Sequence, residues 1–293
     1  MSAWGAHKWW RLANMITPIS LTNFASLAAI EFRTSLGGPS VTAGGTASAS
    51  STATGTPAGV FDLVSPTLWT SNAIPAFIQY ELPVAMDIIQ ISLKPRTDFP
   101  VQSPNYLTVK YSDDGTNFTT LESFFPAIWV ANVYQTFTLH GPSANRYTQI
   151  GPPLTNTPGN FISASEIAFR TTYGGSAATG GMPGVRSQTT GNATTLFNGN
   201  LTDTWTALTG DTASYIAMDW GNGNEQNIVQ IGVWPCFDAP SFTFTGFSHR
   251  QSSDGETWTT IASYTPAAWV AGTPQSFPAS APPITSQAFF GAV

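Results

Sequence analysis

Acidic residues occupy three matched positions in the two halves of the 293-residue chain. Pairs of carboxylates are the catalytic groups of glycoside hydrolases. The equivalent positions are Glu81 and Asp219, Asp98 and Asp238, and Asp114 and Asp254. Asp114 and Asp254 each precede a glycine, where aspartate serves the backbone of a turn. Glu81 and Asp219 end strand-like runs, so we expect them to be solvated or capping. One acid per repeat remains, and we predict no enzymatic activity.

Other residue types typical of catalytic sites are scattered along the chain. His7, His140 and His249 occupy non-equivalent positions, and no G-x-S-x-G nucleophile motif or phosphate-binding loop occurs. The single cysteine, Cys236, excludes a disulfide framework and a cysteine-based metal cluster. The sequence therefore points to binding rather than to catalysis.

Aromatic, acidic and basic residues in matched segments predict a site for a sugar ring, because an aromatic face packs on the ring while polar side chains bond its hydroxyls. Two of these segments read Pro-Ala-x-Trp-Val-Ala, and two are loops bounded by prolines at 95–100 and 235–240. The candidate ligand-binding residues are Trp129, Trp269, Arg96, Asp98, Trp234 and Asp238. Core packing is the alternative for the first two, since an indole is usually largely buried.

These positions belong to an internal duplication. Ile30–Gly38 matches Ile167–Gly175, and Tyr111–Thr120 matches Gln251–Thr260. Pro126–Ala131 likewise matches the segment 266–271, so the order is kept at a nearly constant offset. We predict two domains, residues 1–142 and 143–293.

Within each copy the strand signals are short and evenly spaced. Ile88–Leu93 is rich in β-branched residues, and Leu107–Tyr111 alternates apolar and polar residues before an Asp-Gly turn. Because no segment shows a sustained helical period, we predict two tandem antiparallel β-sandwiches. Trp10, Phe32, Trp69 and Trp205 are expected in their cores, and the Gly- and Ser-rich stretches 37–59 and 174–191 are expected to be long loops within the domains.

Composition narrows the possible partners. Charged residues make up only 9% of the chain and the net charge is −6, with three lysines. This cannot supply the basic surface that nucleic acid requires, so we expect no nucleic-acid partner. No apolar run reaches the length of a membrane span, and no signal peptide is visible at the start. We therefore expect that the chain is made in a cytoplasm and does not insert into a membrane.

Four motifs together resemble the discoidin, or coagulation-factor C-type, galactose-binding-like domain. They are an opening aromatic strand at Trp9–Leu12, the strand Ser165–Arg170, the loop Phe197–Trp205 and the hairpin Tyr111–Phe118. The segment Trp269–Phe277 is most similar to the version found in tailed-phage virion proteins. The resemblance implies galactose-binding-like jelly rolls.

The resemblance also implies calcium in the loop between the Phe-Asp-Gly and Thr-x-Trp motifs. The second copy offers oxygen donors there at Asn198, Asn200 and Asp203, which suit a hard cation, whereas the first copy offers Asp62 alone. Ala29 of the first copy also stands where the family usually has glutamate. A plain turn held by Asn and Asp side chains is the alternative for both loops.

The function implied is that of a phage virion surface protein, in a tail fibre, baseplate or head appendage, whose sandwiches bind host-surface carbohydrate without catalysis. The expected partners are other virion proteins and host glycan, and the expected location is the virion, with several copies present or a homo-oligomer. A structural decoration or connector protein is one alternative. A glycan-binding accessory module of a separate enzyme is another.

Overall fold

A computed structural model describes residues 2–17, 24–64, 67–152, 154, 156, 161–211 and 213–279. These residues form antiparallel sheets and four short 3-10 turns, and no α-helix occurs among them. The predicted all-β, galactose-binding-like sandwich fold is confirmed. No helix in the described part of the chain is long and apolar enough to cross a membrane.

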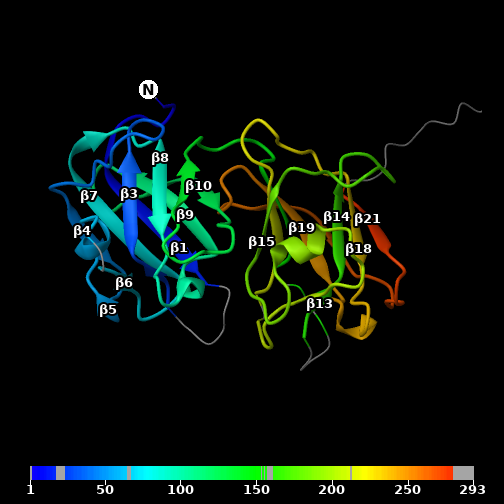
Figure 1. The fold of residues 1–293 in the computed structure, drawn as a ribbon. Helices are drawn as coiled ribbons and strands as arrows, with labels where there is room; N and C mark the ends of the chain where they lie inside the picture. The colour runs from blue at the N-terminus through cyan, green and yellow to red at the C-terminus, as the bar shows by residue number, and fades with distance from the viewer. Residues whose placement is uncertain are drawn as a thin grey trace, which may run out of the picture.

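The strands of the N-terminal half form one five-stranded sheet and two smaller sheets (Figure 1). The large sheet has the order β10-β9-β1-β7-β4, and the others have the orders β11-β8-β3 and β2-β6-β5. The bounds are β1 His7–Ile16, β2 Ser26–Leu27, β3 Ala29–Arg33, β4 Thr46–Ala49, β5 Thr54–Gly55, β6 Trp69–Thr70, β7 Ala76–Met86, β8 Gln90–Lys94, β9 Tyr106–Ser112, β10 Thr119–Phe124 and β11 Gln135–Thr138, with turns η1 Ala58–Val60 and η2 Pro100–Gln102.

The C-terminal half repeats this arrangement with sheet orders β15-β17-β12-β19-β20, β14-β18-β21 and β13-β16. The bounds are β12 Tyr147–Ile150, β13 Ser163–Ala164, β14 Glu166–Arg170, β15 Met182–Val185, β16 Trp205–Thr206, β17 Ile216–Asp219, β18 Gln230–Trp234, β19 Phe247–Ser252, β20 Thr259–Tyr264 and β21 Gln275–Pro278, with turns η3 Ala193–Phe197 and η4 Pro240–Phe242. No strand pair among the described residues joins the two halves, although the domain limits at 142 and 143 stay a prediction.

Each half has its own apolar core, built from the inward-facing residues of its strands. Trp10, Trp69 and Trp205 have no exposed surface and Phe32 is 1% exposed, so the expected core aromatics are confirmed. The C-terminal core also holds a buried histidine, His249 of β19.

The Asp-Gly turns close hairpins as predicted. Gly115, between β9 and β10, has a φ of 73°, a conformation that costs glycine little. The carboxylate of Asp114 accepts the backbone N–H groups of Asn117 and Thr116, both at 2.8 Å. These bonds hold the pKa of Asp114 below its usual range. Asp254 makes the matching bonds in the second hairpin.

The two Gly- and Ser-rich stretches are more ordered than the loop prediction allowed. Each supplies an edge strand to the large sheet of its half, β4 against β7 and β15 against β17. The small side chains allow close approach: a Cβ added at Gly184 in β15 would lie 2.0 Å from the ring of Phe125.

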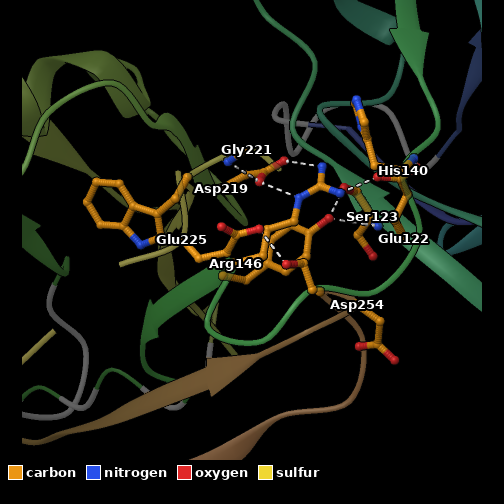
Figure 2. A network of polar contacts seen from close by, with 12 residues as sticks. Glu122, Ser123, His140, Arg146, Asp219, Gly221, Glu225 and Asp254 are labelled. Carbon is orange, nitrogen blue, oxygen red and sulfur yellow. Dashed lines mark hydrogen bonds and ion pairs between the residues drawn. The ribbon is translucent and has the colours of Figure 1, made fainter. Parts of the chain in front are cut away.

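Side chains join the halves where β10 meets β12 (Figure 2). Arg146, just before β12, donates to the carboxylate of Glu122 in β10, and also to both oxygens of Asp219 at 2.8 and 3.0 Å. Asp219 is not solvated as expected, because its side chain is only 9% exposed and is paired with Arg146. It does cap the backbone after its strand, since its Oδ1 accepts the N–H of Gly221 at 2.9 Å. Its counterpart Glu81 is 29% exposed and pairs with Lys8.

A second set of contacts continues this seam. Glu256, in the turn after β19, accepts bonds from Lys110 at 2.6 Å and from Asn14 at 2.8 Å. The hydroxyl of Tyr147 donates to the backbone oxygen of Ser123 at 2.7 Å, and Phe125 packs beside Tyr147 in a small apolar cluster. The halves therefore meet through buried polar and apolar groups rather than through a strand pair.

Candidate functional site

One end of the N-terminal sandwich carries a cavity of about 270 Å³. The loop after β8 lines it with Arg96, Thr97 and Asp98, and the last residue of β8 lines it with Lys94. Tyr134, just before β11, completes the polar and aromatic part of the wall. The cavity is near the small end of the range for ligand sites, which suits a single ring with polar substituents.

Arg96 and Asp98 form a two-pronged ion pair in this wall. The Arg96 Nε lies 2.6 Å from Asp98 Oδ1, and Nη2 lies 2.7 Å from Oδ2. These hydrogen bonds lower the pKa of Asp98 and raise the pKa of Arg96. The pair fixes the direction of both groups, with the Asp98 side chain still 54% exposed. An exposed carboxylate held in place is a suitable acceptor for ligand hydroxyls.

Tyr134 and Lys94 were not predicted as site residues. Tyr134 is 39% exposed, and burial of the remainder raises the pKa of its phenol. Lys94 Nζ lies 5.9 Å from the centroid of the Tyr134 ring. The sequence offers a signal for Lys94, which is one of only three lysines, and none for Tyr134.

Trp129 lies in a loop, as expected, but its ring is only 8% exposed and packs on the N-terminal core. Its Nε1 donates to the backbone oxygen of Pro104 at 2.8 Å. Core packing therefore describes Trp129, and little of its surface is left for stacking on a sugar. Trp269 is half-buried, packs against the C-terminal core, and donates to Phe244 at 2.9 Å. Both tryptophans thus pack against the apolar core of their own half.

The loop after β18 does not reproduce the Arg96–Asp98 pair, because the buried Cys236 occupies the position equivalent to Arg96. Trp234 is half-buried, and the guanidinium of Arg170 lies 5.7 Å from its ring centroid. Asp238 is exposed and forms no ion pair within the described ranges. Of the candidate residues in the N-terminal half, Arg96 and Asp98 thus line one cavity and Trp129 does not, and the pair is not repeated in the C-terminal half.

In the candidate calcium loop, the side chains of Asn198, Asn200 and Asp203 form hydrogen bonds within the loop itself. Asn198 donates to Asp203 Oδ2 at 3.1 Å and accepts the N–H of Asn200 at 2.7 Å. Asn200 in turn accepts from Thr202 at 3.1 Å. These bonds are those expected of the plain-turn alternative, and they also bring amide and carboxylate oxygens together.

Glu166, the first residue of β14, adds a second carboxylate to this loop. Its Oε2 accepts the N–H of Gly199 at 3.1 Å, and burial raises the pKa of Glu166 to about 7. The donors fit a hard cation, although no three His, Cys, Asp or Glu side chains converge among the described residues, so amide or backbone oxygens would have to complete the site.

The loop of the N-terminal half fits a cation poorly. Asp62 Oδ1 accepts the backbone N–H of Val64 at 2.8 Å and the hydroxyl of Thr67 at 3.1 Å. Ala29 occupies the register position that Glu166 has in the other half, so the second carboxylate is missing.

Residues 45–167, less than half of the chain, match the model of the F5/8 type C domain family. No curated protein and no solved structure matches the chain. The match runs from just before β4 into β14 and so crosses from the first half into the second. The match includes β12, which is the central strand of its large sheet as β1 is of the other. The discoidin-like resemblance is therefore supported over these residues, which begin partway through one structural repeat and end in the next.

Proposed function

We propose that the chain binds carbohydrate without altering it, and that the cavity beside Arg96 and Asp98 is the principal site. The observation that carries this proposal is the fixed ion pair in a cavity wall next to the exposed ring of Tyr134. Asp98 accepts hydroxyl hydrogens, the remaining Arg96 N–H donates to ring or hydroxyl oxygens, and Tyr134 packs on the apolar face of the sugar. The match to a discoidin-like domain agrees with ligand binding as the function.

We also propose that the protein is a surface component of a phage virion and that the glycan belongs to the host. The support is the similarity of its Trp269–Phe277 ending to virion members of the family. Several copies on one particle would turn weak single-site affinity into strong attachment.

A structural connector role is the second candidate. It is favoured by an exposed apolar segment, in which Ile128, Val130 and Val133 are 73%, 59% and 51% exposed. Such a segment suits contact with another protein. A connector would bury it against a neighbouring chain, whereas a glycan receptor would leave the Arg96 cavity open.

The test is a glycan array and a host-cell binding assay with the purified chain displayed in many copies. We expect selective binding that Asp98→Ala abolishes. Asp238→Ala is the matched control, because it removes the equivalent carboxylate of the other half, and it should bind as the parent does. Equal binding by both variants would overturn the assignment of the site. No binding of the parent chain to any glycan or cell would overturn the function.

A further inference from the structure

The two halves carry opposite charges at one pair of register positions. In the N-terminal half Ala29 of β3 faces Lys94 of β8, and in the C-terminal half Glu166 of β14 faces Trp234 of β18. The pairs that follow along the strands keep the same register, down to Arg33 with Gln90 and Arg170 with Gln230. The repeat thus places an ammonium group at the end of one sandwich where the other has a carboxylate.

Lys94 differs from the other two lysines in having no acidic partner. Lys8 is paired with Glu81 and Lys110 with Glu256, at 2.7 and 2.6 Å. Within the described residues Lys94 Nζ forms no hydrogen bond or ion pair, and it lies 5.9 Å from the centroid of the Tyr134 ring. An ammonium group in a cavity wall without a counter-ion is a site for an anion.

The charged residues that the structure describes in the lining of the cavity are Lys94, Arg96 and Asp98, and their charges sum to a single positive charge. Arg96 is balanced by Asp98, and Arg33 by Glu31. Asp62 does not line the cavity, and its carboxylate accepts bonds from Val64 and Thr67 of the wall. Lys94 is left over. A ligand with one negative charge would neutralise it, whereas a phosphate dianion would leave an excess negative charge facing the carboxylate of Asp98.

We propose that this cavity takes a sugar that bears a carboxylate, with Lys94 pairing with the carboxylate, Tyr134 packing on the ring and Asp98 accepting a hydroxyl. This proposal rests on the proposed function and names the class of sugar. The binding energy combines one charge-assisted contact with ring packing, so a monosaccharide should bind weakly and a displayed oligomer more strongly.

The test compares glucuronic acid, glucose and inorganic phosphate by titration calorimetry or by ligand-observed NMR on the full chain. We expect glucuronic acid to bind at least about tenfold more tightly than glucose, since one charge-assisted bond distinguishes them. Lys94→Gln should remove that advantage, so that the ratio of the two affinities falls to about one. Lys8→Gln, which removes a lysine charge elsewhere, should behave as the parent, and added salt should weaken only glucuronic acid binding.

The outcomes separate this proposal from the general one. Equal affinity for glucuronic acid and glucose, or a tenfold preference that survives Lys94→Gln, overturns the carboxylate assignment while carbohydrate binding stands. Phosphate binding that is tighter than glucuronic acid binding and depends on Lys94 also overturns it. If neither sugar binds the parent chain or its displayed form, the carboxylate proposal fails, and the glycan array decides the general one.

Discussion

Arg146 and Glu122 form a buried ion pair between the two halves, with side chains only 3% and 0% exposed. Figure 2 shows the Arg146 guanidinium between Glu122 on one side and Asp219 on the other. Although burial lowers it, the bonds to Asp219 and the charges nearby raise the pKa of Arg146 overall, and burial raises the pKa of Glu122. Removing the Arg146 charge would leave the carboxylates of Glu122 and Asp219 buried without a cation, so we expect its loss to destabilise the protein.

We predict that Arg146→Met lowers the free energy of unfolding by roughly 3 kcal/mol, since it leaves two buried carboxylates without a cation. Urea denaturation followed by tryptophan fluorescence measures the change. Lys8→Met is the control: its ion pair with Glu81 joins side chains that are 43% and 29% exposed, and the cost should stay below about 1 kcal/mol. A loss of unfolding free energy for Arg146→Met as small as that of the control would show that the buried ion pairs contribute little to stability.

A second prediction concerns acid stability and His249. Its ring is fully buried, neither nitrogen has a hydrogen-bond partner among the described residues, and burial lowers its pKa to about 4. An unfolded histidine titrates near pH 6.5, so below that pH the unfolded state takes up a proton that the folded state resists. This group should therefore reduce the free energy of unfolding by about 3 kcal/mol between pH 7 and pH 4.

The substitution that tests this is His249→Val, because Val109 stands at the equivalent position of β9. We expect the variant to lose much of the pH dependence over this range and to be more stable at pH 4.5, as measured by urea midpoints at both pH values. A pH dependence identical to that of the parent chain would contradict the assignment.

A third prediction concerns the loop that holds Glu166 and Asp203. If this loop binds Ca²⁺, the cation needs the ionised carboxylate of Glu166, whose pKa is about 7. Affinity should rise as the pH increases from 6 to 8, and Ca²⁺ should raise the melting temperature of the parent chain but not of Glu166→Gln. Asp62→Asn should respond as the parent does. A melting temperature indifferent to Ca²⁺ at pH 8 would leave the loop as a plain turn.

The sequence was sufficient for the fold because the duplication repeated each strand signal. The Asp-Gly turns and the alternating run before Asp114 determine local geometry on their own, as the hairpin bonds show. Trp10 and Trp205 lie in the cores as expected, in line with the usual burial of large aromatic side chains. Trp129 was harder to place, because small neighbours in a loop do not reveal that Pro104 covers the ring nitrogen.

The site was only partly predictable. Arg96 and Asp98 are two residues apart on one loop, so their proximity follows from the sequence. Tyr134 lies 40 positions from Lys94, and the pairing of β11 with β8 is what brings them to one cavity. The buried partners of Asp219 were likewise hidden, since Arg146 and Glu122 come from opposite halves of the chain.

The most direct test of the central claim is to map where a sugar binds, by following backbone amide NMR signals while glucuronic acid and then galactose are added. We predict that the signals that move belong to the cavity wall, at Ala29, Arg96, Thr97, Asp98 and Tyr134, and that they stay fixed in Asp98→Ala. Movement confined to other parts of the chain, or no movement with either sugar, would contradict the claim that this cavity is a carbohydrate site.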